Sequence, residues 1–355
     1  MKTKRIISVI LAVLLAFGCV MPSYAASTEN SGVSNFRRTI EGYIETITRV
    51  LRSNLEGKKY GEYTELCDIP ETENGYVPQG FCYSEATDCY YISYYHKTNA
   101  SIISIVDAES GKRIKTVNLK KSNGDDFTGH AGGIAEDGVF FYVCHGSRIY
   151  RLTLAELALA PDGGSVYLVN SIMTDVKCSY INSDGEYLYA GEFYVYDADG
   201  GYDTDASHHM AISLFETTYS RCNAYKLSDI SSDFIKGQKE ISVPEFVLTT
   251  PNSVQGFARL ENGSLALATS FGRNNNSNLK IYNDVTKEEA DFELDYQGEK
   301  VPAFHLKKSD RAENRCVPPM LEGIDDMNGK TAGIFESGAK TYSDSKFIVN
   351  KICEF

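Results

Sequence analysis

The sequence has no tryptophan, only six histidines and no Cys-x-x-Cys pair, and each scarcity narrows the possible functions. Without Cys-x-x-Cys spacing, a zinc site built on cysteines is not expected. No Gly-x-Ser-x-Gly motif occurs, so the sequence does not indicate the nucleophile elbow of a serine hydrolase. The absence of tryptophan argues against a dedicated glycan binder, although 24 tyrosines supply aromatic surface for stacking.

Positive charge is also scarce. The sequence has 35 Lys and Arg residues and 48 Asp and Glu residues, which gives a net charge of −13. A field of this sign repels polyanions, so nucleic acid is not an expected partner. The hydrophobic fraction of 42% and the charged fraction of 23% are ordinary for a globular protein and exclude a disordered chain, collagen and a coiled coil. A chain of 355 residues can form two domains, but closed all-β folds often reach this length as one unit.

Long hydrophobic runs are missing after the N-terminus. Residues 6–17 are an uncharged run, apolar except for Ser8, that follows Lys2, Lys4 and Arg5. This run is shorter than the roughly 20 residues that span a bilayer, and no later segment is a candidate span. With the small-x-small sequence at residues 23–25, we expect residues 1–25 to be a signal peptide and the protein to be secreted. The alternative is a lipoprotein that is acylated at Cys19.

Residues 26–59 combine a polar leader with a helical pattern. The leader is rich in Ser, Asn and Thr, and Ser34 or Asn35 can cap the helix that follows. We expect an amphipathic helix that packs on the body of the domain, with a partner-binding or membrane-surface helix as the alternative. The apolar residues at helical spacing are Phe36, Ile40, Tyr43, Ile44, Ile47, Val50 and Leu51.

A repeat of β-strand patterns runs from Tyr60 to Phe355. In each unit a short apolar strand leads through a turn into a second apolar strand, and Asp-Gly or Asn-Gly turns favour hairpins because both residues accept positive φ. The first strands align at residues 78–81, 132–135, 179–182, 255–258 and 322–325. The second strands follow at residues 90–95, 139–143, 187–190, 265–269 and 331–335.

Further strands complete each unit. Third strands are expected at residues 102–106, 148–152, 223–227, 279–282 and 347–352, and fourth strands at 114–119, 166–170, 246–249 and 292–296. Four-stranded units repeated around an axis predict an all-β fold, a β-propeller. We expect a single domain over residues 60–355 with five blades of four antiparallel strands, and six blades remain an alternative.

The last unit ends after its third strand, and residues 62–69 can supply the fourth. That pairing closes the ring and removes the open sheet edges. It would place Cys67 beside Cys353, so we expect a disulfide between them. A second disulfide, between Cys82 and Cys89, is expected if Glu85-Ala86 forms a two-residue turn.

Polar residues gather at equivalent points of different units, where first strands begin and second strands end. In a propeller these points surround one mouth of the central channel, where ligands bind. Glu192, Glu322 and Glu336 are candidate acid–base residues, and together they could also hold Ca²⁺. His130 and His145 are candidates for proton transfer. The expected ligand-binding residues are Gln79, Tyr94, His96, Gln255 and Arg273. The alternative is structural: each of these side chains caps a turn or bonds a neighbouring blade.

An acidic loop at residues 197–205 is a second candidate metal site. Asp197, Asp199, Asp203 and Asp205 alternate along it, as in loops that fold around Ca²⁺. The EF-hand pattern is not met, because its sixth position is Tyr202 rather than glycine. A solvated acidic loop is the alternative.

The Glu322-Gly323 start of a channel strand resembles the lactonase and gluconolactonase-like propellers. That resemblance implies a divalent cation at the channel. A five-bladed ring is similar to the propellers of several glycoside hydrolase clans, which implies three channel carboxylates, and Glu192, Glu322 and Glu336 are the set available here.

We therefore expect a secreted propeller that binds a small molecule, a glycan or an extracellular protein at its channel mouth. The alternatives are a hydrolase or lyase that uses the channel carboxylates, with Ca²⁺ as a candidate cofactor, and a structural surface module.

Overall fold

The computed structural model describes residues 38–45, 47, 60–196, 201–213, 216–236 and 240–355. The chain divides into two compact units, residues 1–45 and 46–355. Residues 38–45 of the first unit are helical, within the helix expected from the apolar pattern. The predicted signal peptide lies outside the described residues. None of the described helices is long and apolar enough to cross a bilayer.

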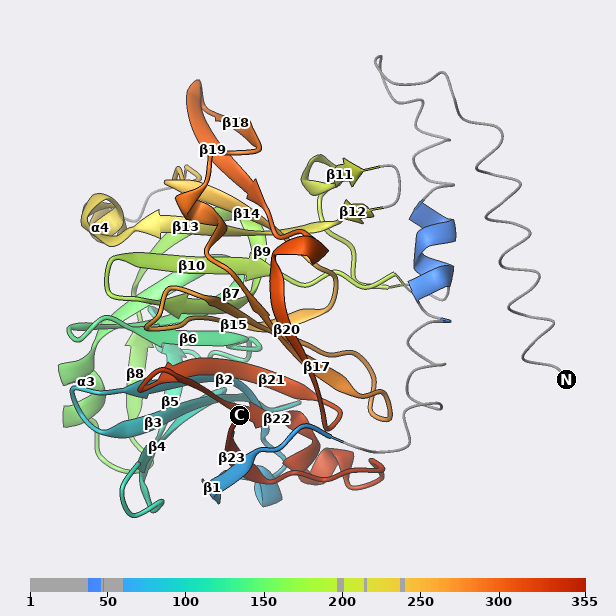
Figure 1. Cartoon of the computed structure of the whole chain (residues 1–355). Helices are drawn as coiled ribbons and strands as arrows, with labels where there is room; N and C mark the ends of the chain where they lie inside the picture. The colour runs from blue at the N-terminus through green and yellow to red at the C-terminus, as the bar shows by residue number, and fades with distance from the viewer. Residues whose placement is uncertain (1–37, 46, 48–59, 197–200, 214–215, 237–239) are drawn as a thin grey trace, which may run out of the picture. The chain divides into compact units, whose positions relative to one another are not determined.

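The all-β propeller prediction is confirmed, whereas the blade count is not (Figure 1). We describe the strands as five blades, of which blades 2 and 3 share one eight-stranded sheet. Blade 1 contains β2 (Val77–Ser84), β3 (Cys89–Tyr95), β4 (Ile102–Asp107) and β5 (Arg113–Lys121). Blade 2 contains β6 (Gly133–Glu136), β7 (Phe140–Thr153) and the first residues of β9 (Asn170–Ser183). Blade 3 contains the rest of β9, β10 (Tyr187–Glu192), β13 (Ser220–Lys226) and β14 (Phe246–Thr250). Blade 4 contains β15 (Val254–Arg259), β16 (Leu265–Thr269), β17 (Ser277–Tyr282) and β20 (Arg311–Val317). Blade 5 contains β21 (Leu321–Met327), β22 (Lys330–Phe335), β23 (Lys351–Glu354) and β1 (Thr64–Asp68).

Blade 2 reaches four strands because β7 folds back on itself. The backbone N–H of Leu154 donates to the carbonyl of Val139 at 3.0 Å, so the two ends of β7 lie side by side. Gly146, with φ +57°, lies between them and takes a left-handed conformation that suits glycine. The second half of β7 then pairs with the first residues of β9.

The first strands of the blades form a closed cycle. β2 contacts β6, β6 contacts β9, β9 contacts β15, β15 contacts β21, and β21 contacts β2. The repeated glycines allow this close approach: a Cβ on Gly323 would lie 2.5 Å from the backbone nitrogen of Phe81 in blade 1. A Cβ on Gly133 would lie 2.4 Å from the nitrogen of Ile181 in blade 3. The glycines found in the repeat are therefore where neighbouring first strands meet backbone to backbone.

The ring closes through β1, which pairs antiparallel with β23 from the opposite end of the chain. Thr64 lies opposite Glu354 and Cys67 lies opposite Ile352. Because β1 supplies the fourth strand of blade 5, both ends of the strand repeat contribute to one sheet (Figure 1).

Two predicted fourth strands belong to other blades. β8 (Ser165–Leu168) pairs in parallel with β5 and extends blade 1, whereas blade 2 takes its fourth strand from β9. β18 (Phe292–Tyr296) pairs with β19 (Glu299–His305), which adds in parallel to β14 of blade 3. The fourth strand of blade 4 is β20. A periodic pattern predicts that a strand exists, but it does not choose between two neighbouring sheet edges.

Short elements fill the connections between these strands. The α-helices are α3 (Leu154–Leu159) and α4 (Leu227–Lys236), which each follow the third strand of a blade. The 3₁₀ helices are η1 (Thr72–Asn74), η2 (Ala206–His208), η3 (Val285–Lys287), η4 (Lys308–Asp310), η5 (Glu336–Gly338) and η6 (Lys340–Tyr342). β11 (Met210–Ser213) and β12 (Glu216–Thr218) form a separate two-stranded hairpin.

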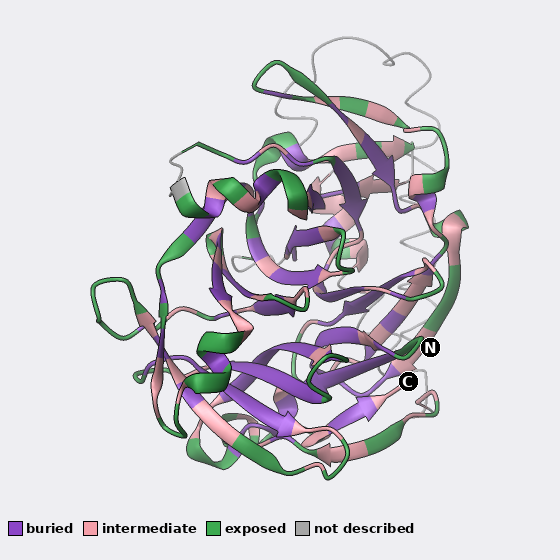
Figure 2. Ribbon diagram, turned by 90° about the vertical axis from the view of Figure 1, so that its left-hand side faces the viewer, coloured by how far each residue is buried: buried purple, intermediate pink, exposed green. Residues whose placement is uncertain are grey.

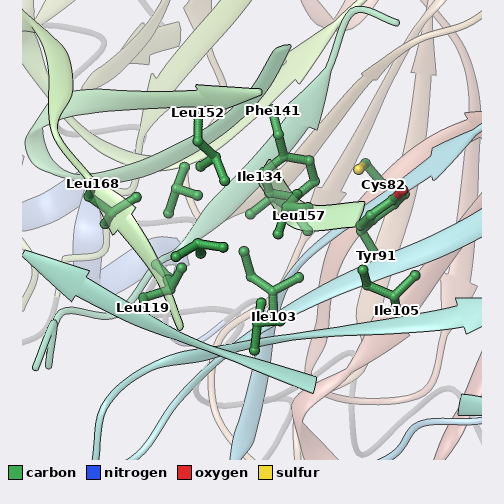
Figure 3. Packing of buried hydrophobic residues seen from close by; sticks show 14 of the residues in the cluster. Cys82, Tyr91, Ile103, Ile105, Leu119, Ile134, Phe141, Leu152, Leu157 and Leu168 are labelled. Atoms are coloured by element: carbon green, nitrogen blue, oxygen red, sulfur yellow. The ribbon is translucent and has the colours of Figure 1, made fainter. Parts of the chain in front are cut away.

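The hydrophobic core lies between adjacent blades rather than at one centre. Between blades 1 and 2, for example, Ile103 and Tyr91 pack in one cluster with Phe141 and Leu152 (Figure 3). Figure 2 shows the result: strands are mainly buried, and connecting loops are mainly exposed. Inner strands such as Leu265–Thr269 are buried on both faces, which explains why they are apolar without alternation, whereas outer strands such as β1 and β20 are partly exposed.

The two predicted disulfides are absent, and all eight cysteines of the described residues are free thiols. Cys67 lies opposite Ile352 and packs on the same cluster as that residue, whereas Cys353 belongs to the cluster on the other face of the sheet. The register therefore places the two sulfurs on opposite faces, which no disulfide can join. Cys82 lies opposite Tyr91, because the turn before Cys89 has four residues rather than two.

Candidate functional site

The starts of the first strands and the ends of the second strands meet at one mouth of the channel. This follows from antiparallel pairing: Leu321, at the start of β21, lies opposite Phe335, at the end of β22. In blade 1, Val77 likewise lies opposite Tyr95. The polar residues that sequence analysis assigned to these points therefore share one end of the ring.

Gln79 and Glu336 are in direct contact at this mouth, although they belong to different blades. The Gln79 Nε2 donates to Glu336 Oε1 at 2.7 Å and to its neighbouring carbonyl, that of Pro78, at 3.0 Å. The Gln79 side chain is buried, so its amide orients the carboxyl group of Glu336. Burial raises the pKa of Glu336 to about 7, and the Gln79 hydrogen bond and the Arg273 charge limit the rise.

Glu322 is the second carboxyl group of the mouth. It lies on β21 with 5% of its surface exposed, and its Oε2 has no hydrogen-bond partner among the described residues. Burial, and then the nearby charge of Glu336, raise the pKa of Glu322 well above its usual range. Burial therefore favours the protonated form of Glu322 and leaves the pKa of Glu336 near 7.

An aromatic and cationic rim surrounds these carboxyl groups. The Arg273 guanidinium lies 4.7 Å from the centroid of the Tyr342 ring and forms an ion pair with Asp344 at 3.1 Å. The Tyr342 and Tyr95 hydroxyls are 3.5 Å apart. Tyr95 in turn packs on the ring of His130, with the ring centroids 4.5 Å apart.

The two predicted histidines of this mouth lie together. The backbone N–H of His130 donates to Nδ1 of His145 at 3.2 Å. Partial burial, and then the charge of His130, lower the pKa of His145, so this imidazole is neutral at pH 7. Its Nδ1 acts as an acceptor, which assigns the N–H to Nε2. The histidines extend the rim from blade 1 to blade 2.

A polar bridge crosses the channel below the mouth. Asn182 of blade 3 donates its Nδ2 to Asp325 Oδ1 of blade 5 at 2.7 Å, and these two blades are not neighbours in the ring. Tyr83 of blade 1 donates its N–H to Asp325 Oδ2 at 2.9 Å, and Arg259 of blade 4 donates its N–H to Asn182 Oδ1 at 3.0 Å. Burial raises the pKa of Asp325 to about 7. Side chains from blades 3 and 5 thus meet across the axis of the channel.

The other predicted site residues differ from this pair in their contacts and burial. Glu192 bonds His208 at 2.8 Å and accepts the backbone N–H of Arg221, so among the described residues the predicted set of three carboxyl groups reduces to the pair of Glu322 and Glu336. Tyr94 is fully buried in the cluster under blade 1, because the pleat of β3 sends it away from the mouth and sends Tyr95 toward it. His96 accepts the backbone N–H groups of two residues in the following turn. Gln255, on β15, is partly exposed.

The acidic loop contains no metal cluster among the described residues. Asp197 and Asp199 lie outside the described residues. Asp205 caps η2, because its carboxylate accepts hydrogen bonds from the backbone N–H and the hydroxyl group of Ser207, at 2.9 and 2.8 Å. Asp203 accepts the N–H of Thr204 at 3.0 Å. The two described aspartates thus form local turns.

Sequence reasoning missed Tyr95, Tyr342, Asp344 and the Asn182–Asp325 bridge. A signal for Tyr342 and Asp344 was available, because the long connection at residues 336–350 follows a strand that ends at the mouth. Tyr95 depends on the strand register, and the bridge depends on the ring diameter. Neither of these is visible in a repeat pattern.

No family model matches the chain, and no curated protein matches it. Solved structures that are similar include the PQQ-bound form of aldose sugar dehydrogenase from Streptomyces coelicolor, with 15% identity, 83% of this chain and 96% of that chain covered, and a TM-score of 0.44. Glutaminyl cyclase from Myxococcus xanthus has 9% identity, 83% and 94% coverage and a TM-score of 0.41. The WD40 repeats of RRP9 have 10% identity, 82% and 99% coverage and a TM-score of 0.38.

Proposed function

We propose that the protein is an exported propeller that binds a small hydroxyl-rich ligand, a monosaccharide or the end of a glycan, at the channel mouth. The observation that carries this proposal is the Gln79–Glu336–Glu322 group beneath the rim of Tyr342, Tyr95 and Arg273. An amide donates and accepts hydrogen bonds, and a carboxyl group whose pKa is raised by burial can do both in its protonated form, which matches hydroxyl groups. The tyrosines supply flat apolar surface for a sugar ring.

Replacing Glu336 by glutamine tests this proposal. Glutamine keeps the size of the side chain but carries no charge and cannot exchange a proton, so we expect the affinity for the best-binding sugar to fall at least about tenfold, the cost of one hydrogen bond to a charged group. A glycan array and isothermal titration of the best monosaccharide would measure the affinity.

The matched control is Glu313→Gln, because Glu313 is a partly exposed carboxylate on β20 that pairs with Arg315. This variant should bind like the unchanged protein. Equal affinity for Glu336→Gln and the unchanged protein, or binding of no sugar at all, would contradict a sugar site at this mouth. Retention of a protein partner by immobilised propeller would then favour the protein-binding alternative.

A second candidate function is a hydrolase or lyase reaction at the same mouth. It is favoured by the difference in pKa between the two carboxyl groups: the pKa of Glu322 is raised well above its usual range, and that of Glu336 is about 7, and an acid and a base need pKa values that differ. The same Glu336→Gln variant distinguishes this reading. Product release from the bound oligosaccharide should vanish while thermal stability is kept, and retained turnover would remove Glu336 from the mechanism.

Export is the remaining element of the proposal. The charged start, the apolar run and the small-x-small sequence support cleavage after Ala25. Mass spectrometry of the protein from the culture medium of an exporting host should therefore find Ala26 as the first residue. A lipid-modified Cys19 at the N-terminus would support the lipoprotein alternative instead.

A further inference from the structure

A second candidate site lies on blade 3, away from the channel carboxyl pair. A cleft of about 610 Å³ is lined by residues 173–175 of β9, where this strand passes from blade 2 to blade 3, and by the η2 loop and the β18–β19 hairpin. Its polar lining residues include Asp175, His208 and Arg221, and its apolar lining residues include Met173, Ile241 and Leu294. The channel-mouth proposal uses none of these residues.

His208 is held rigidly at the base of this cleft. Only 3% of its side chain is exposed, and its Nδ1 lies 2.8 Å from Oε1 of Glu192, whose side chain is 1% exposed. The backbone N–H of Arg221 donates to the same carboxylate oxygen at 3.2 Å. A carboxylate only accepts, so Nδ1 carries a proton, and in the neutral ring Nε2 keeps its lone pair.

The free Nε2 faces a second acceptor. It lies 3.9 Å from Oδ2 of Asp175, beyond hydrogen-bond distance, and it has no hydrogen-bond partner among the described residues. Asp175 is itself fixed as an acceptor, because Asn223 Nδ2 donates to it at 2.6 Å and the Tyr296 hydroxyl donates at 2.9 Å. When the ring is neutral, two acceptor atoms face each other across this gap.

A hydrogen-bond donor placed in this gap would satisfy both atoms. Charged N–H groups approach carboxylate oxygens at about 2.7–2.9 Å, so one ammonium group can reach two acceptors that are 3.9 Å apart. Arg221 lies near the same carboxylate, at 3.5 Å, and offsets one negative charge. Asp205 at the rim and Glu192 behind the imidazole keep the surroundings acidic, so a cation is favoured over an anion.

We propose that this cleft binds an organic molecule with a primary ammonium group, which donates to His208 Nε2 and Asp175 Oδ2. The apolar body of the ligand packs on Met173, Ile241 and Leu294. An alkylamine, an arylalkylamine or the lysine side chain of a peptide has this chemistry. Glu192, which sequence analysis assigned to the channel mouth, instead serves as the residue that positions His208.

Three probes of the same shape test the proposal: benzylamine, benzyl alcohol and benzoate. Binding to the full mature chain is followed by ligand-observed NMR and by titration. We expect benzylamine to bind at least tenfold more tightly than benzyl alcohol, and benzoate not to bind. Equal affinity for the alcohol would overturn the ammonium assignment, and preference for benzoate would assign the cleft to anions through Arg221.

Single substitutions test whether benzylamine binds in this cleft. Asp175→Asn should lower benzylamine affinity at least tenfold, whereas Asp126→Asn, which changes an exposed aspartate on blade 1, should not change it. Because Asp175 accepts several hydrogen bonds, its variant can lose stability, so the unchanged protein supplies a second readout. The ¹⁵N resonance of His208 Nε2 should shift on addition of benzylamine, and an unmoved resonance would place the amine elsewhere. Glu336→Gln should leave benzylamine binding intact, so the two sites fail or succeed separately.

Discussion

Replacement of Gly323 by alanine is expected to destabilise the protein by about 3 kcal/mol, the upper part of the range for overpacking. The added Cβ would lie 2.5 Å from the backbone nitrogen of Phe81 and 2.7 Å from the carbonyl oxygen of Gln79. Both atoms are backbone atoms of β2, so no side chain can rotate away, and blades 5 and 1 must separate. Urea unfolding of the purified variant would measure the loss of free energy.

Gly124→Ala is the matched control. Gly124 has φ +89°, and no atom lies within 4 Å of the point that a Cβ would occupy, so alanine there adds conformational strain without a clash. Its cost should be about 1 kcal/mol. If Gly323→Ala costs no more than this control, the backbone contact between the first strands of blades 5 and 1 is wrong. The test therefore examines the ring closure itself.

Much of the fold could be predicted from the sequence because it depends on local patterns. The turns at Gly138, Gly185, Gly263 and Gly329 all have positive φ, as Asp-Gly and Asn-Gly hairpins require. The outer strands were predicted less well. β8 and β18 are recognisable as strands, but they join blades 1 and 3, and such a choice depends on tertiary packing.

Part of the site could also be predicted from the sequence, because the repeat identifies equivalent positions in different blades. Gln79, Glu322, Glu336 and Arg273 were found because equivalent positions of a repeat share one end of the ring. Glu192 occupies an equivalent position too, yet it turns to His208, which comes from an insertion that no other blade has. A repeat predicts where a backbone position lies, but an inserted loop decides what its side chain meets.

Small errors of register had large consequences. A shift of one residue in β1 against β23 turns a side chain to the other face of the sheet, which separates Cys67 from Cys353. A turn of four residues instead of two shifts the pairing of β2 and β3 by two residues, so Cys82 and Cys89 stay on one face but Cys82 lies opposite Tyr91. The alternation of side chains along β3 puts Tyr94 in the core and Tyr95 at the rim.

The stability of the protein is expected to fall as the pH rises through the neutral range, because Asp325 ionises inside the channel. Burial raises its pKa to about 7 in the folded protein, whereas an unfolded aspartate has a pKa of about 3.9. Between these values the folded state binds the extra proton, so the free energy of unfolding decreases with pH. The loss from this group is about 4 kcal/mol between pH 4 and pH 8, and it is complete above the folded pKa.

Asp325→Asn should remove this component, which urea unfolding at pH 4, 6 and 8 would measure. Asparagine can still accept from Asn182 and from the N–H of Asp326, but the N–H of Tyr83 loses its acceptor, at a cost of about 1–3 kcal/mol. The variant should therefore be less stable than the unchanged protein at pH 4 and more stable at pH 8. Asp344→Asn, at an exposed carboxylate of the rim, should leave the profile unchanged. Parallel profiles for Asp325→Asn and the unchanged protein would mean that Asp325 is ionised throughout, held so by its three donors. Glu322 and Glu336 add decreases of the same sign, so the variant should retain a weaker slope rather than none.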